Sequence, residues 1–301
     1  MAIPYAHCDL NPEVLIQKHE RSKGMSFLTR IAVTLVVVTG WIAPAGAAPK
    51  AALWEIWAAY GPAGGIVLDH SDWSRFLEHY VRPGSDGISR VAYSEVTAAD
   101  LVVLEAYIGA LAAKPVRSLS RAEQLPYWVN LYNALTVRVV LEHYPVASIR
   151  DIDISPGLFA DGPWGKKLAV VEGEAVSLDD IEHRILRPLW RDPRIHYTVN
   201  CASIGCPNLQ PYAMTAGNAE DFLNGAAVAY INHPRGARIE NGELYVSSIY
   251  DWFEADFGGD DAGVIAHLKD FAEGELAEAL KTVSRIADDS YDWRLNGTVV
   301  P

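Results

Sequence analysis

The stretch from Leu125 to Pro145 constrains the fold most, because it is long, helical in its periodicity and apolar on almost every side. Ser120 is suited to cap its N-terminus, and Glu123 follows three residues later, which is the spacing of a capping box. Pro145 ends the pattern. A helix without a polar face cannot lie on a surface, so we expect this helix at the centre of a domain, with other elements packed around it.

Shorter elements of both kinds surround that helix. Apolar residues at three- and four-residue spacing predict helices over 53–80, 98–111, 178–186, 220–232 and 262–280. Alternation predicts two hairpins, over 167–177 and 237–246, and a buried strand over 195–199. Asn241-Gly242 in the second hairpin suits a two-residue type I′ turn. The fold class that follows is α+β: a mainly helical single domain with a small, mostly antiparallel sheet built from hairpins.

The N-terminal segment predicts export. Met25–Arg30 supplies a basic flank, a short apolar run follows, and Ala45 and Ala47 are the small residues of a cleavage site. This run is short for a membrane span, although an uncleaved anchor over residues 31–48 stays an alternative.

Two regions follow from this segment. Residues 1–47 are expected to be a signal peptide or N-terminal anchor, and residues 48–301 a single domain outside the cytoplasm, either periplasmic or extracellular. The chain carries 25 basic and 38 acidic side chains, and such a surface repels nucleic acid and anionic lipid. We therefore expect no nucleic-acid partner, membrane contact only through an uncleaved N-terminal segment, no cofactor, and a small-molecule or peptide-like substrate.

Several separate motifs resemble the domain of unknown function 547 family. In chain order they are Leu125–Leu135, Tyr144–Ile149, Asp179–His183, Leu186-Arg187, Asp192–His196, Asn200–Pro207, Ser248–Phe253, Asp256–Gly258 and Tyr291–Asn296. The resemblance covers nearly all of the exported part and implies membership of that family. It brings no activity with it, so the function has to be argued from the residues.

Cys201 is the candidate nucleophile, because it follows the predicted strand and precedes small, turn-forming residues, where backbone N–H groups are available to an oxyanion. His183 is its expected base. His196 is only the substitute for His183, because alternation along the predicted strand turns its side chain to the face opposite Cys201. Asn130 or Asn133, three residues apart on the central helix, could orient the imidazole in a Cys-His-Asn arrangement. The residues expected to bind substrate are Ser203, Tyr127 and Glu182.

This arrangement predicts thiol-dependent acyl transfer or hydrolysis on a peptide-like or envelope substrate, and other interpretations stay open. In an oxidising compartment Cys201 and Cys206 can form a structural disulfide within a non-catalytic binding or scaffold domain. The same pair could instead cycle between dithiol and disulfide, although its spacing differs from the usual redox motif. A metal-binding protein would use His183, His196, Cys201 and Cys206, in a spacing that matches no standard zinc site.

Overall fold

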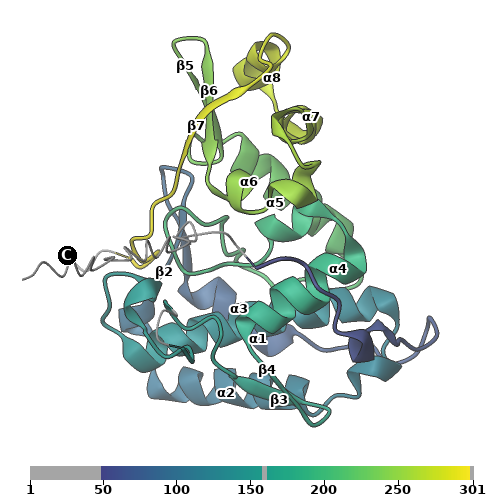
Figure 1. The fold of residues 1–301 in the computed structure, drawn as a ribbon. Coiled ribbons are helices and arrows are strands. Elements are labelled where there is room, and N and C mark those ends of the chain that lie inside the picture. Colours follow the sequence, from purple (N-terminus) through teal and green to yellow (C-terminus); the bar gives the residue numbers. More distant parts are fainter. Residues whose placement is uncertain (1–48, 158–160, 299–301) are drawn as a thin grey trace, which may run out of the picture. The chain divides into compact units, whose positions relative to one another are not determined.

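The computed structural model describes residues 49–157 and 161–298, so the predicted signal peptide and the division of the chain at residue 47 lie outside it. The described residues belong to one compact unit. That unit is mainly helical with short strands, which confirms the predicted α+β class (Figure 1). Within residues 49–157 and 161–298, no helix is both long enough and apolar enough to cross a membrane.

The central helix is α3, Arg121–His143, as predicted. The Ser120 side chain accepts a hydrogen bond from the Glu123 backbone N–H and caps the helix. Every residue from Glu123 to Val137 is buried. Helix α2, Ala98–Ala112, packs against it, and α1, Ser71–Tyr80, packs against α2 (Figure 1). These three helices together contribute nearly half of the buried residues of a first hydrophobic core.

A second, smaller core lies between helices and the only three-stranded sheet of the described residues. Strands β5, Ala237–Glu240, and β6, Glu243–Ser247, form the predicted antiparallel hairpin. The turn residues Asn241 and Gly242 have φ of 53° and 83°, as a type I′ turn requires. Strand β7, Ile286–Ser290, adds parallel to β6, which the sequence did not predict.

The remaining elements are short. The helices of the second core are α5 (Ala219–Ile231), α6 (Ile249–Trp252), α7 (Asp261–Phe271) and α8 (Gly274–Leu280). Two further antiparallel hairpins pair β1 (Val81–Pro83) with β2 (Ser89–Val91) and β3 (Ala169–Val171) with β4 (Glu174–Val176). Single 3₁₀ turns occupy Glu55–Ala58, Tyr93–Glu95, Val116–Ser118, Ile149–Asp151 and Glu254–Phe257. The hairpin β3–β4 was predicted, and β1–β2 was not.

The predicted buried strand over 195–199 is wrong, because Pro193–Tyr197 forms a 3₁₀ helix. Asp192 caps this helix by accepting a hydrogen bond from the Arg194 N–H at 2.9 Å, and Pro193 suits its first position. All residues from 195 to 200 are buried. A segment that is buried on every side has no outward face, so alternation along it could not distinguish strand from helix.

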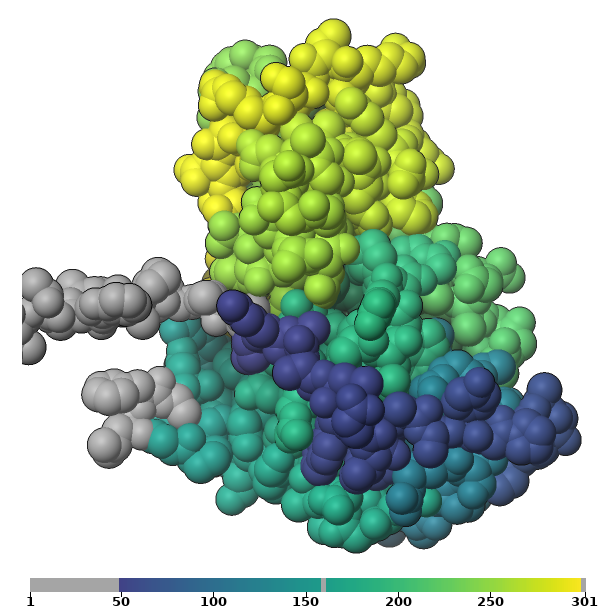
Figure 2. Space-filling view, turned by 45° about the vertical axis from the view of Figure 1, so that its right-hand side comes forward, coloured from purple at the N-terminus to yellow at the C-terminus, as the bar shows by residue number. Residues whose placement is uncertain are grey.

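The helix over 178–186 is present but differs from the prediction. Asp180–Leu186 is a π-helix that continues into α4, Arg187–Trp190, so Pro188 does not end it. Pro188 has no N–H to donate, and the π-helix shifts the backbone hydrogen-bond pattern. Carbonyl groups of the π-helix that would be bonded in a regular helix are therefore left free. Backbone N–H groups of Ala52 and Trp54 bind the carbonyls of His183 and Arg184, each at 3.0 Å. Figure 2 shows this early segment, in purple, lying across the surface of the molecule.

Candidate functional site

Cys201 is half-buried and its sulfur lies among hydroxyl groups. Its Sγ is 3.2 Å from Ser203 Oγ and 3.1 Å from Tyr291 Oη. The Ser203 hydroxyl in turn donates to Tyr291 Oη at 3.1 Å. Burial raises the pKa of Tyr291 well above its usual value, so this phenol stays protonated and can donate to the sulfur. Ser203, which was predicted to bind substrate, therefore contacts Cys201 itself, and Tyr291 completes a triangle of polar atoms.

A second thiol adjoins the first. The backbone N–H of Cys201 donates to Cys206 Sγ at 2.9 Å, and both sulfurs are free thiols in the structure. Hydrogen bonds from Cys206, Ser203 and Tyr291 lower the pKa of Cys201 against the opposing effect of burial. Burial raises the pKa of Cys206 well above that of an ordinary thiol. The two cysteines therefore differ in character, and the disulfide between them remains a prediction for the oxidised protein.

The loop that carries Cys201 is fixed from inside by two asparagines. Asn133 on α3 donates to the Thr198 carbonyl at 2.9 Å and accepts from the Asn200 N–H at 2.8 Å. Asn200 closes the loop by donating to the Pro207 carbonyl at 2.7 Å. Ala202 has φ of 57°, a left-handed conformation that alanine rarely adopts. Such strain persists only where the surroundings enforce it, so the loop is held in a single shape.

Residues of the second core fix the same loop from the other side. The Tyr230 hydroxyl donates to the Gly205 carbonyl at 2.7 Å, and Arg235 donates to the Ile204 carbonyl at 2.8 Å. The thiols therefore sit where the two hydrophobic cores meet.

Asn130, Asn133 and Tyr127 do not have the roles that the sequence predicted. Asn130 holds the backbone of Met214, donating to its carbonyl at 2.8 Å and accepting from its N–H at 3.2 Å. Within the described residues, the partners of both amides are backbone groups and not an imidazole, so their observed role is to hold backbone segments. Tyr127 is fully buried and donates to the Leu111 carbonyl, which leaves it no surface for a substrate.

Both histidines belong to a buried ionic cluster. His196 Nε2 is 2.8 Å from Asp256 Oδ2, and Arg187 donates to the same oxygen at 2.6 Å. Glu182 Oε1 lies 3.7 Å from His196 Nδ1 and 3.9 Å from His183 Nδ1. The π-helix, the 3₁₀ helix at Pro193–Tyr197 and the 3₁₀ turn at Glu254–Phe257 are thereby joined.

The charges in this cluster support one another. Burial raises the pKa of Asp256, but hydrogen bonds from His196 and Arg187 outweigh it and lower that pKa to about 2. Burial likewise opposes ionisation of Glu182, whose pKa the charges of His183 and His196 lower to about 2. The pKa of His196 is raised, since both carboxylates outweigh its burial, whereas burial lowers the pKa of His183.

The histidines and the thiol are neighbours without forming a nucleophile and base pair. Within the described residues, the partners of Cys201 Sγ are hydroxyl and thiol groups, not an imidazole. Tyr132 lies between the two groups: it donates to Glu182 Oε2 at 3.2 Å, and its pKa is raised by burial, by the Glu182 charge and by Cys201. The predicted Cys-His contact is thus replaced by a contact between the thiol and Tyr291.

The contacts that Tyr291, Asp256 and Arg187 make were not predicted from the sequence. All three stand inside the motifs by which the chain resembles its family, and that was the available signal. Their partners are distant in sequence, so no spacing could have paired them.

Half-buried indole rings adjoin Tyr291, the residue that contacts the thiol. The Tyr291 ring lies 4.8 Å from the ring of Trp252 and 4.7 Å from that of Trp293, between centroids. All three side chains keep some exposure to solvent. They provide apolar surface beside Cys201.

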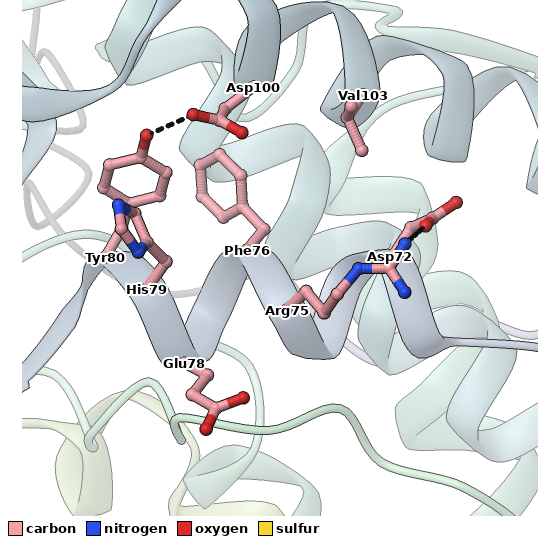
Figure 3. A pocket seen from close by; sticks show the side chains of 8 residues that line it. All are labelled: Asp72, Arg75, Phe76, Glu78, His79, Tyr80, Asp100 and Val103. Carbon is pink, nitrogen blue, oxygen red and sulfur yellow. Dashed lines mark hydrogen bonds and ion pairs between the residues drawn. The ribbon is translucent and has the colours of Figure 1, made fainter.

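A separate hollow lies between α1 and α2 (Figure 3). Tyr80 donates to Asp100 at 2.6 Å, and Arg75 pairs with Asp72. No predicted site residue lines it, so it is distinct from the cysteine loop.

No metal centre is formed by the part of the chain that the structure describes, where no group of three or more His, Cys, Asp or Glu side chains is arranged to hold an ion. The carboxylates near the histidines are occupied by Arg187 and by the imidazoles themselves. This geometry gives the metal interpretation no support.

Comparison with protein families shows where this arrangement belongs. Residues 116–231 match the family described as a protein of unknown function, DUF547. The predicted resemblance to DUF547 is confirmed over this segment of the chain. The segment matched to DUF547 contains α3, the π-helix and the whole cysteine loop, whereas Asp256 and Tyr291 lie beyond it. No curated protein and no solved structure matches the chain.

Proposed function

We propose that this DUF547 protein is an exported thiol-dependent acyl transferase or hydrolase whose nucleophile is Cys201. One observation carries the proposal: the sulfur of the partly buried Cys201 lies within 3.2 Å of the hydroxyls of Ser203 and Tyr291, on a loop fixed by buried asparagines. Hydrogen-bond donors around a thiol favour the thiolate, which is the nucleophilic form. The loop supplies that thiolate in a fixed position, as efficient attack requires.

The reaction needs no imidazole in contact with the sulfur. The Cys201 thiolate forms a bond to the acyl carbon of an ester or amide, the bond to the leaving group breaks, and the leaving group takes up a proton. Water or a second acceptor then attacks the thioester and releases the thiol. The Tyr291 hydroxyl, which itself accepts from Ser203, is the donor nearest to the sulfur when its charge moves onto the substrate.

The surroundings of Cys201 favour a substrate with an apolar part. Half-buried Trp252 and Trp293 adjoin Tyr291, and indole rings provide flat apolar surface with a polar N–H edge. A peptide-like or envelope-derived substrate has both features that the site requires, an acyl carbon and an adjacent apolar part.

The test is acylation by an activated ester. Reduced protein is incubated with p-nitrophenyl acetate, and intact mass followed by peptide mapping locates the acyl group. The proposal expects a transient acetyl adduct on Cys201 that is absent from the Cys201→Ser variant. Cys206→Ser, which keeps the more accessible thiol of Cys201, is the matched control and should still be acylated. An adduct that forms no faster than on a free cysteine peptide contradicts the proposal.

A non-catalytic scaffold is the second candidate, and the asparagine contacts favour it. Asn130 and Asn133 both hold distant backbone segments against α3, which is how a rigid binding domain would use them. In that case the cysteines serve only to close the loop. Failure of the acylation test, with a quantitative disulfide in the protein as isolated, supports this candidate.

A further inference from the structure

Cys206 has a use that nucleophilic catalysis by Cys201 does not give it. Its side chain is only 3% exposed. Its sulfur accepts the N–H of Cys201 at 2.9 Å and lies 3.7 Å from the Val199 carbonyl, to which it can donate. No outside molecule reaches such a thiol easily, so the chemistry open to it is with its neighbour.

The loop holds the two cysteines together without a covalent bond, with Cys206 Sγ against the Cys201 backbone N–H. Tyr230 and Arg235 fix the carbonyls of Gly205 and Ile204, and Asn200 ties the loop's two ends. Bringing two thiols together normally costs loop-closure entropy. Here the folded loop already positions both cysteines, so little further entropy is lost when they bond. A bond between them therefore needs little rearrangement of the backbone.

The two thiols also differ in the way that sequential oxidation requires. Cys201 is the less buried of the two and has the lower pKa, so it meets an oxidant first and forms the thiolate more readily. Cys206 is buried with a raised pKa, so it stays reduced and protonated until its neighbour has reacted. Redox-sensitive cysteines are commonly reactive, accessible and placed beside a resolving thiol.

We propose that Cys206 is the resolving thiol of Cys201, with a hydroperoxide as the oxidant. The Cys201 thiolate attacks one peroxide oxygen, the O–O bond breaks, and the other fragment leaves as an alcohol or water after taking a proton. Cys201 is then a sulfenic acid. The Cys206 sulfur attacks the Cys201 sulfur, the S–O bond breaks, and the hydroxide leaves as water with the Cys206 proton. The peroxide is reduced and the thiol pair is oxidised to a disulfide.

The disulfide removes the nucleophile reversibly. One consequence rests on the proposed function: with Cys201 as the catalytic thiol, disulfide formation inactivates the protein and a dithiol reactivates it. The same bond keeps Cys201 from passing to the irreversible sulfinic acid. An exported protein meets oxidants often, so this protection has a clear purpose.

The experiment treats reduced protein with hydrogen peroxide and follows mass, not turnover. Wild type is expected to lose two hydrogens, to show a Cys201–Cys206 linked peptide, and to recover fully with dithiothreitol. Cys206→Ser is expected to give a dimedone-trappable sulfenic acid at Cys201 and several-fold more dithiothreitol-resistant sulfinic acid than wild type. Cys201→Ser should give neither product.

Wild-type protein that accumulates sulfinic acid at Cys201 as fast as Cys206→Ser overturns the proposal. Circular dichroism checks that the variants are folded. Should Cys206→Ser fail to fold, the wild-type products decide alone, since disulfide supports the resolving role and sulfinic acid refutes it. Because no substrate is used, failure here is distinct from failure of the ester assay.

Discussion

At the scale of single residues, Asp256 is the group on which the ionic cluster depends. Its Oδ2 accepts from both His196 and Arg187, which are almost fully buried. Removing the carboxylate charge leaves two buried cationic groups poorly paired, and buried groups that lose such a partner are costly. The cluster is therefore a structural support for the loop's surroundings as well as a neighbour of the thiol.

Asp256→Asn is expected to lower the free energy of unfolding by about 2 kcal/mol near pH 5.5. The folded pKa of Asp256 is about 2, below its ordinary 3.8, so its contribution is present above pH 3.8 and disappears as the pH falls toward 2. The raised pKa of His196 gives a contribution that is present below 6.5 and disappears as the pH rises through the folded value. The loss should therefore be largest between about pH 4 and 6.5.

Urea unfolding at several pH values measures this difference. Asp251→Asn, a change to an exposed acid on α6, is the matched control and should alter stability little. A loss for Asp256→Asn that is the same at pH 2.5 and pH 5.5 would show that the charge has no such role.

At the scale of elements, the long helix and the hairpins were predictable, because their periodicity and caps are local properties. Ser120 and the Asn241-Gly242 turn did what their chemistry predicts. The π-helix was not predictable, since the extra residue per turn is stabilised by backbone N–H groups of Ala52 and Trp54, far away in sequence. The 3₁₀ helix at Pro193–Tyr197 was misread as a strand because burial on every side removed the pattern.

The two asparagines of α3 give a prediction at this scale. Asn133→Ala and Asn130→Ala should each cost about 2 kcal/mol, because each leaves a buried backbone N–H and carbonyl without partners. Of these two asparagines, only Asn133 holds the cysteine loop. Alkylation of Cys201 by iodoacetamide should therefore change in Asn133→Ala and stay as in wild type in Asn130→Ala. Equal effects of both variants on alkylation would mean that the loop does not depend on Asn133.

At the scale of the whole molecule, the candidate site depends on contacts between the C-terminal segment and the cysteine loop. After β7 the chain passes back to the cysteine loop, where Tyr291 reaches Cys201 and Asn296 donates to Asn200 at 3.2 Å (Figure 1). The cysteine loop and the family resemblance could be predicted from the sequence. The contact between Tyr291 and Cys201 could not, because residues ninety positions apart leave no local pattern in the sequence. The histidines, predicted to act on the thiol, instead lie beside Glu182, a residue predicted to bind substrate.

Export is the prediction that concerns the chain as a whole. The protein expressed from its full sequence should be processed at the small residues that follow the apolar run, so the mature chain begins at or next to Ala48. N-terminal sequencing of protein from the cell envelope fraction checks this. A mature chain that still contains residues 31–43 would favour the membrane anchor instead.

The most direct test of the account is the pH profile of Cys201 alkylation in fully reduced protein, with peptide mapping to separate it from Cys206. The account predicts a midpoint below that of an ordinary cysteine thiol, and an upward shift with slower labelling near neutral pH in Tyr291→Phe. Tyr250→Phe, a buried tyrosine bonded to Tyr197, should leave the profile unchanged. A wild-type midpoint at or above the ordinary value, or one that Tyr291→Phe does not move, would contradict it.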